Sequence, residues 1–292
     1  MSLFAAAIFS FMTGLNLPME RSDHHKDTEP PATIKLLLQP RQKQTSLKIE
    51  ALIGEQDKSY QEILAQLREK EKAKTLRSSL PAQFQGKTIE QVEIPNQQKV
   101  IALTFDDGPW PETTNHVLYV LKKNAVKATF FVVGKNAQRY PNQLKKILEN
   151  GHAIGNHTWN HHYNYHNSPA AAREIDNTAA LIYKITGFKT TLFRPPGGIL
   201  DNGLANYAGQ KNYAVIMWSA DPKDWHFRST STNLIKDVVN IAQPGGIVLL
   251  HDGGGERSTT VQALPILITE LKKRGYKFVT VPELLEMATN SK

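Results

Sequence analysis

The sequence predicts an α/β fold built on a parallel β-barrel, with an N-terminal extension in front of it. From about Lys99 onward, short apolar runs alternate with segments of helical periodicity, which is typical of right-handed βαβ units and a parallel sheet. Five polar motifs follow the apolar runs. A barrel gathers its site from the carboxyl ends of many strands, whereas an open sheet binds ligands at one switch point. The motifs therefore favour the barrel.

Seven strands and five helices are expected in this region. The strands are Val100 to Phe105, Ala128 to Val133, His152 to Asn156, Thr191 to Arg194, Ala214 to Trp218, Ile247 to Leu250 and Lys277 to Val281. The helices are Glu112 to Asn124, Asn142 to Asn150, Ser168 to Thr186, Thr232 to Ala242 and Val261 to Arg274. A looser connection spans Ile199 to Asn212.

The chain is expected to have three parts, residues 1–19, 20–98 and 99–288. Residues 3–17 are almost wholly apolar, about as long as a signal-peptide core and shorter than the roughly 20 residues of a membrane-spanning helix. We expect export to an extracytoplasmic location, with or without a membrane anchor. No Lys or Arg precedes this run, so a buried structural helix is the alternative.

The second part, residues 20–98, has one clear helix signal. Its apolar residues recur at helical spacing, at Tyr60, Ile63, Leu64 and Leu67, and predict one amphipathic helix. This helix can pack on the third part or act as a spacer beneath it. Residues 99–288 carry all five motifs and form the predicted catalytic domain.

Composition narrows the chemistry. The net charge of +8 comes from scattered basic residues that are interleaved with acids, which indicates a solvated surface and no nucleic-acid partner. An anionic cell-wall or membrane surface is the other reading of this charge. Cysteine is absent, which excludes disulfides, thiolate ligands and cysteine nucleophiles. A bound metal ion must therefore be held by His, Asp or Glu.

Two motifs carry the residue types of a metal-assisted hydrolase. Asp106 and Asp107 end the first apolar run, and successive side chains at a strand end diverge, so one can face a metal ion while the other faces water. His157 and His161 are four residues apart and would share one helix face if the segment is helical. With one Asp they form a set that leaves positions open for water and a carbonyl oxygen. A surface turn and a polar His-rich loop are the alternatives.

The third motif joins Arg194 to a rigid Pro-Pro-Gly-Gly turn. Arg194 can hold a carboxylate in a bidentate pair and keep it ionised. The backbone N–H of Gly197 or Gly198 can donate to a developing oxyanion, because glycine lets a ligand approach closely. The alternative is a surface arginine that precedes a stiff turn.

The last two motifs supply a histidine and a partner for it. His251 follows an apolar run and suits a general acid, since its pKa lies near neutrality. Asp224 can orient such a histidine, and Trp225 offers a flat apolar face on which a sugar ring can pack. A structural histidine and a core tryptophan are the alternatives.

At these five motifs the chain resembles the polysaccharide deacetylase (NodB-like) family, carbohydrate esterase family 4, from about Lys99 to Glu286. The resemblance implies a distorted seven-stranded (β/α) barrel. It also implies a hydrolase that removes N-acetyl groups from N-acetylglucosamine-type residues of a polysaccharide, peptidoglycan or chitin-like. An O-acetyl esterase on xylan-type polysaccharide and an inactive carbohydrate-binding barrel are the alternatives. We expect a monomer.

The same resemblance implies the metal site and the base. Asp107, His157 and His161 would bind one divalent ion, with Zn²⁺ as the default and Co²⁺ or Ni²⁺ as alternatives. Asp106 would be the catalytic base, and Arg194 would position it.

The remaining roles also follow from the resemblance. His251 would be the catalytic acid, and Asp224 would orient it. Where many members have Tyr after Arg-Pro-Pro, this chain has Gly197, which keeps the backbone N–H thought to serve the oxyanion and lacks the side chain. This departure bears on substrate preference more than on activity.

Overall fold

The computed structural model describes residues 58, 60–65 and 80–289. The chain divides into two units, residues 1–65 and 66–292, which are described separately. In the first unit, residues 58 and 60–65 are helical, as the spacing of apolar residues predicts, and both Tyr60 and Ile63 are exposed. Leu67 and the apolar run of residues 3–17 lie outside the described residues. Within the described part of the chain, no helix is both long enough and apolar enough to cross a membrane.

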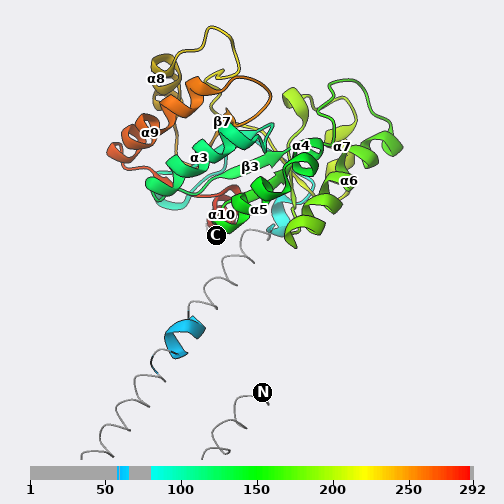
Figure 1. Ribbon diagram of the computed structural model, residues 1–292, viewed down its shortest axis with the longest axis horizontal. Coiled ribbons are helices and arrows are strands. Elements are labelled where there is room, and N and C mark those ends of the chain that lie inside the picture. The colour runs from blue at the N-terminus through cyan, green and yellow to red at the C-terminus, as the bar shows by residue number, and fades with distance from the viewer. Residues whose placement is uncertain (1–57, 59, 66–79, 290–292) are drawn as a thin grey trace, which may run out of the picture. The chain divides into compact units, whose positions relative to one another are not determined.

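In the second unit, residues 80–289 form one parallel sheet of eight strands with helices packed around it (Figure 1). The strand order is β1-β6-β5-β4-β3-β2-β7, and β8 pairs with β2. The strands are β1 (Thr88–Ile89), β2 (Val100–Asp106), β3 (Thr129–Val132), β4 (Ala153–Asn156), β5 (Leu192–Phe193), β6 (Ala214–Ile216), β7 (Gly246–His251) and β8 (Lys277–Phe278). The predicted α/β class and parallel sheet are confirmed.

The sheet curls into a half-barrel. The segment that follows β6 reaches β7 across the open side and partly closes it. Ala220 forms an isolated parallel bridge with Val248 of β7. The backbone N–H of Ser219 donates to Ile247 O at 3.0 Å, and the N–H of Leu249 donates to Ala220 O at 2.9 Å. A short bridge in place of a full strand pair makes the barrel distorted, as expected.

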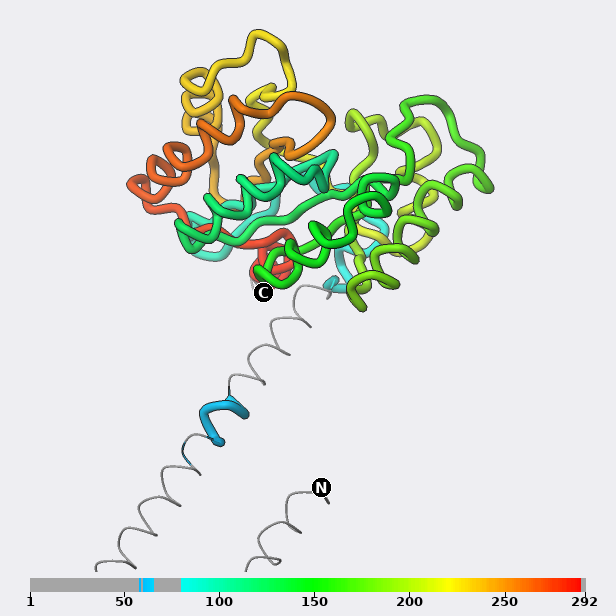
Figure 2. The backbone as a smooth tube through the Cα atoms, viewed as in Figure 1, coloured from blue at the N-terminus to red at the C-terminus, as the bar shows by residue number. Residues whose placement is uncertain are grey.

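The helices form the outer layer. They are α3 (Pro111–Lys123), α4 (Gly134–Arg139), α5 (Pro141–Glu149), α6 (Ser168–Thr186), α7 (Leu204–Gln210), α8 (Ser231–Ile241), α9 (Ser258–Lys273) and α10 (Val281–Thr289). Figure 2 shows the orange α9 beside the green α3, and these two helices are in contact. The five predicted helices and the loose segment that becomes α7 are found close to their expected bounds. The short helices α4 and α10 were not predicted.

The end of the last strand differs from the prediction. Lys277 to Val281 was expected to be one strand, but β8 stops at Phe278 and α10 begins at Val281. Thr280 and Glu283 form a capping box, in which Glu283 Oε2 accepts the Thr280 N–H at 2.7 Å. This cap starts a helix where the apolar pattern alone reads as a strand.

The strand β1 was also not among the seven predicted. It lies within residues 20–98, pairs with β6, and brings Ile89, Val92 and Ile94 into the core beneath the sheet. Residues 80–98 therefore belong physically to the barrel. The division of the chain at residues 19 and 98 stays a prediction.

The register of the central strands aligns the predicted site residues. Every residue of β2 is buried, as in a parallel strand that is covered on both faces. Asp106 at the end of β2 pairs with His251 at the end of β7. Asn156 of β4 pairs with Phe193 of β5, so the residues that follow them, His157 and Arg194, leave the sheet at the same level. The carboxyl ends of four strands thus deliver polar residues to one edge.

Candidate active site

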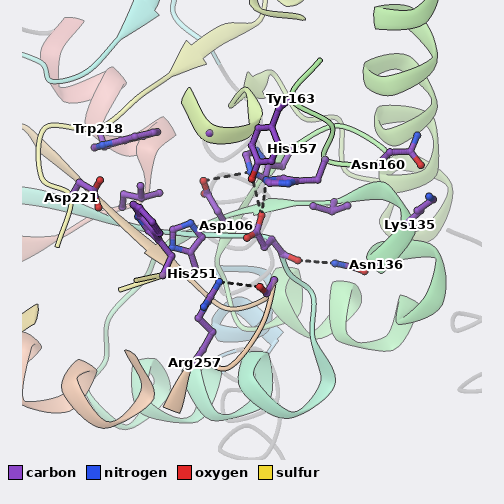
Figure 3. A pocket seen from close by; sticks show the side chains of 17 residues that line it. Asp106, Lys135, Asn136, His157, Asn160, Tyr163, Trp218, Asp221, His251 and Arg257 are labelled. Carbon is purple, nitrogen blue, oxygen red and sulfur yellow. Dashed lines mark hydrogen bonds and ion pairs between the residues drawn. The ribbon is translucent and has the colours of Figure 1, made fainter. Parts of the chain in front are cut away.

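A cavity of about 690 Å³ opens at this edge of the sheet (Figure 3). Seven of the nine predicted site residues line it: Asp106, Asp107, His157, His161, Gly197, Trp225 and His251. The other two, Arg194 and Asp224, are buried behind the lining, where they hydrogen-bond to Asp106 and His251. The structure therefore brings all nine into one neighbourhood.

Asp107, His157 and His161 converge at the cavity floor. Asp107 Oδ1 lies 3.0 Å from His161 Nε2 and 3.5 Å from His157 Nε2. One ligand atom from each residue lies within 4.8 Å of the other two. Two imidazoles and one carboxylate at this spacing are suited to a single divalent ion.

This convergence does not use a helix. Residues 157–161 form a loop after β4, and the helical arrangement considered for the two histidines is wrong. Thr158 and His161 have φ values of 69° and 60°, which turn the loop back toward β2. Glu174 of α6 fixes the turn, because its Oε2 accepts the backbone N–H groups of Trp159 and Asn160 at 2.9 and 2.8 Å.

The donor atoms fit a cation. His157 Nδ1 lies 2.7 Å from the carbonyl oxygen of Arg194, which can only accept, so Nδ1 carries the proton. In the neutral ring, Nε2 then presents a lone pair toward Asp107 Oδ1, a buried atom without a hydrogen-bond partner among the described residues. Two facing lone pairs repel each other unless a cation or a proton lies between them. The tautomer of His157 is the one that a metal ligand needs.

The charges of this group are coupled. Burial alone would raise the pKa of Asp107, but the imidazoles of His157 and His161, whose Nε2 atoms lie 3.5 and 3.0 Å from Oδ1, outweigh burial and hold the pKa well below its usual range. Burial alone would lower the pKa of His161, but Asp107 outweighs it and raises the pKa. The carboxylate of Asp107 is therefore ionised and ready to bind a cation.

Arg194 is fully buried and holds Asp106. Its Nη1 donates to Asp106 Oδ1 at 2.7 Å and to Thr104 Oγ1 at 2.8 Å. Its Nε and Nη2 donate to the carbonyl oxygens of Ile216 and Met217 at 2.9 and 3.0 Å. With every side-chain nitrogen bonded, the guanidinium fixes one oxygen of Asp106 and leaves Oδ2, 3.7 Å from His157 Nε2, toward the cavity.

His251 is held by Asp224 on the other side of the cavity. Asp224 Oδ1 accepts from His251 Nδ1 at 2.7 Å, and Oδ2 accepts from the His251 backbone N–H and from Thr260 Oγ1. Burial alone would lower the pKa of His251, but Asp224, together with Asp106 and Asp107, raises it. His251 thus keeps its second ring nitrogen for the cavity and keeps its proton more tightly than an ordinary histidine.

Gly197 adopts a φ of 60°, and Tyr163 covers it. A Cβ added at Gly197 would lie 2.9 Å from Tyr163 Cε1, so this ring fills the space of the missing side chain. The Gly198 N–H donates to Pro195 O at 3.0 Å, whereas no hydrogen bond between described residues uses the Gly197 N–H.

Sequence reasoning missed several residues of the site. Tyr163 and Trp218 line the cavity, and Asn136 donates to the carbonyl oxygen of Asp107 at 2.7 Å. Glu174 and Thr104 act from behind the lining. Tyr163 lies two residues after His161 and could have been included with that motif, but the others depend on contacts between distant segments.

Asp252, next to His251, is a buried carboxyl outside the predicted set. Thr114 Oγ1 donates to its Oδ2, and its Oδ1 has no hydrogen-bond partner among the described residues. Burial, with the charges of Asp107 and Asp106, raises the pKa of Asp252 to about 7. The protonated form is therefore the one that folding favours.

We expect Asp252 to make the protein less stable as pH rises. The folded pKa of about 7 exceeds the ordinary value of 3.8, so the contribution is complete below the ordinary value and is lost as pH rises to about 7. The free energies of unfolding of wild type and Asp252→Asn, both treated with chelator, are measured by urea titration at a series of pH values. Between pH 3.8 and about 7, wild type should lose stability relative to the variant. Above about pH 7 the difference between the two proteins should stay constant. Parallel pH profiles of the two proteins would contradict the assignment.

Comparison with known proteins agrees with the site. Residues 93–216 match the family model for polysaccharide deacetylases. The chain is 43% identical over 195 residues to a peptidoglycan-N-acetylglucosamine deacetylase of Bacillus cereus, covering 66% of this chain and 91% of that one.

Two solved structures are similar. The crystal structure of the Bc1960 peptidoglycan N-acetylglucosamine deacetylase aligns with a TM-score of 0.64 at 34% identity, over 71% of this chain and 98% of that one. A CE4 family pseudoenzyme from Bacillus anthracis aligns with a TM-score of 0.63 at 31% identity, over 68% and 69% of the two chains. The curled parallel barrel, the converging Asp and His residues and these similarities together show that the chain belongs to the polysaccharide deacetylase family, carbohydrate esterase family 4.

Proposed function

We propose that this protein is a metal-dependent hydrolase that removes N-acetyl groups from N-acetylglucosamine-type residues of peptidoglycan or a chitin-like polysaccharide and releases acetate. The observation that carries the proposal is the meeting of three groups in and directly behind the wall of one cavity. These are the Asp107, His157 and His161 donor set, the Asp106–Arg194 pair and the His251–Asp224 pair. A pseudoenzyme or a binding module has no need to keep all three.

Asp107, His157 and His161 would hold one divalent ion, with Zn²⁺ as the default and Co²⁺ or Ni²⁺ as alternatives. Such an ion polarises a carbonyl group and makes water a better nucleophile at neutral pH. The chain's own residues then have to place the acetyl group and move two protons.

Asp106 takes a proton from the attacking water. Its Oδ1 accepts a hydrogen bond from Arg194, which leaves Oδ2 directed toward the cavity. As water adds to the acetyl carbon, the carbonyl oxygen becomes an oxyanion, and the Gly197 N–H is free to donate to it. The Gly198 N–H is already bonded to Pro195 O, which favours Gly197 of the two glycines.

His251 donates a proton to the leaving amine. Its Nδ1 is bonded to Asp224, so Nε2 is the nitrogen that can reach the substrate. Cleavage of the C–N bond then gives acetate and a free amino sugar. Trp225, which is 50% exposed, and Tyr163 offer ring faces at the rim of the cavity on which sugar rings can pack.

This function implies a setting for the protein. The protein is proposed to act as a monomer. Cell-wall polysaccharide lies outside the cytoplasm, so an enzyme that acts on it works there, and the relatives named as peptidoglycan deacetylases support that location. The charge of +8 suits an anionic wall.

Mass spectrometry of acetylated glucosamine oligomers and of peptidoglycan fragments, incubated with zinc-loaded protein, tests the proposal. Each hydrolysed acetyl group should appear as one discrete mass loss, and chelation should stop the reaction. Acetyl-xylan in a parallel reaction distinguishes an O-acetyl esterase. Glycan binding without acetate release under Zn²⁺, Co²⁺ and Ni²⁺ would establish an inactive carbohydrate-binding barrel and overturn the proposal.

The Asp224–His251 pair predicts a pH effect. A general acid works only while it is protonated, and Asp224 raises the pKa of His251. Asp224→Asn removes that charge, so the alkaline limb of kcat/KM should move to lower pH and the rate should fall by about 10²–10⁴-fold. Profiles of wild type and variant, both loaded with the same metal, measure the shift. An unmoved alkaline limb would assign it to another group.

A further inference from the structure

A second group of ligand-type side chains lies outside the active-site cavity. His162, His166 and Glu174 each offer a ligand atom within 4.8 Å of the other two, as the active-site set does. None of the three lines the active-site cavity. His161 and His162 are adjacent in sequence, yet His161 lines the cavity and His162 does not, and the φ of 60° at His161 marks the turn between them.

Two members of this group are buried polar residues with unused bonding capacity. His166 is only 5% exposed, and its Nδ1 has no hydrogen-bond partner among the described residues. Glu174 is 6% exposed and forms no ion pair with a Lys or Arg of the described chain. A buried imidazole nitrogen and a buried carboxylate without a cationic partner are both costly unless something completes their bonding.

The carboxylate of Glu174 can accept one more partner. Its Oε2 already accepts the N–H groups of Trp159 and Asn160, but its Oε1 accepts only from Asn160 Nδ2. An ionised carboxylate has about four lone-pair positions, so an acceptor site remains on Oε1. The hydrogen bonds hold Glu174 in place without exhausting it.

One of the two histidines, His166, is also held in place. The backbone N–H of His166 donates to Asn202 O at 2.8 Å, and a Cβ at Gly203 would meet His166 O at 2.1 Å, so only glycine lets the two segments lie so close. Asn167, the next residue, caps α6, since its Oδ1 accepts the Ala170 N–H at 3.1 Å. Glu174 lies on the same helix. His162 is exposed, which gives an ion a route in from solvent.

We propose that His162, His166 and Glu174 bind a second divalent transition-metal ion, separate from the active-site ion. Two imidazoles and one carboxylate form the nitrogen and oxygen set that suits Zn²⁺, Co²⁺ or Ni²⁺. Zinc binds such donors at about 2.0–2.2 Å, and ligand atoms within 4.8 Å of one another are near enough to share one ion.

The second ion has a structural role. The loop of residues 157–166 carries both histidine ligands of the active site and is attached to α6 through Glu174. An ion shared by Glu174, His162 and His166 ties the far end of the same loop to the same helix. The site therefore braces the active-site loop without touching the reacting atoms.

Zinc content of the full-length protein tests the proposal. The protein is loaded with Zn²⁺, desalted and measured by inductively coupled plasma mass spectrometry. Wild type should hold two ions per chain, His162→Gln one, His157→Ala one, and the double variant none. His116→Gln, a change of an exposed histidine on α3, is the matched control and should keep two.

Thermal unfolding gives a second readout that needs no activity. In the His157→Ala background, zinc should raise Tm, because an ion that binds only the folded state stabilises it. The added His162→Gln change should abolish that increase, and since His162 is exposed the variant should fold. One ion in wild type and none in His157→Ala would overturn the second site while leaving the proposed deacetylase intact. Two ions retained in His162→Gln would overturn it as well.

Discussion

Replacing His157 with alanine is expected to remove the active-site ion and to abolish measurable acetate release. His157 presents Nε2 toward Asp107 Oδ1 from a buried ring whose tautomer is fixed by Arg194 O. The polarising effect of a bound ion on the reaction amounts to several kcal/mol, and each 1.36 kcal/mol is a factor of ten in rate, so the expected loss is about 10³-fold or more. Acetate release and zinc content, measured on the same preparation, give both effects.

The matched variant is His251→Ala, which removes the proposed acid and leaves the ion. Its zinc content should equal that of wild type, and its rate should fall by about 10²–10⁴-fold. The pair of variants separates binding of the ion from proton transfer. Wild-type rates in either variant would refute the corresponding role.

The second large effect is on stability. Arg194→Met should lower the free energy of unfolding by about 3–5 kcal/mol, because it leaves the Asp106 carboxylate buried without its charge partner. The carbonyl oxygens of Ile216 and Met217 lose their donors in the same step. Urea unfolding, followed by circular dichroism, measures the change.

A surface pair provides the control. Lys211 and Asp176 lie 4.0 Å apart with both side chains about half exposed, so Lys211→Ala should change the free energy of unfolding by no more than about 1 kcal/mol. Adding Asp106→Asn to Arg194→Met should recover part of the lost stability, since the uncompensated charge is then gone. If Arg194→Met unfolds within about 1 kcal/mol of wild type, the buried pair is not a main support of the site.

Local signals account for much of what the sequence revealed. The helix α6 begins and ends at the predicted residues, and the structure shows local causes for both ends: Asn167 caps its start and Gly187 ends it with a φ of 66°. Asp106 and His251 were placed at strand ends, and parallel register then makes them neighbours. Where a motif follows a buried strand directly, its place in the fold can be predicted from the sequence.

What the sequence could not supply depends on distant contacts. The turn of residues 157–161 needs positive φ values at two residues other than glycine, and Glu174 on α6 stabilises it. The strand β1 is two residues long, too short for any periodicity, and it forms only by pairing with β6. Thr104 belongs to the site because it accepts a hydrogen bond from Arg194, and Trp218 because it lines the cavity. Neither contact can be inferred from the residues that adjoin them in sequence.

The contact between Tyr163 and Gly197 joins two segments of the cavity wall. Substitutions made at one of these positions to change substrate preference will therefore affect the other. A Cβ at position 197 would press on the Tyr163 ring, and the backbone there already has a left-handed φ. A tyrosine introduced at 197 therefore requires the exposed Tyr163 ring to move aside, so the two positions are best varied together.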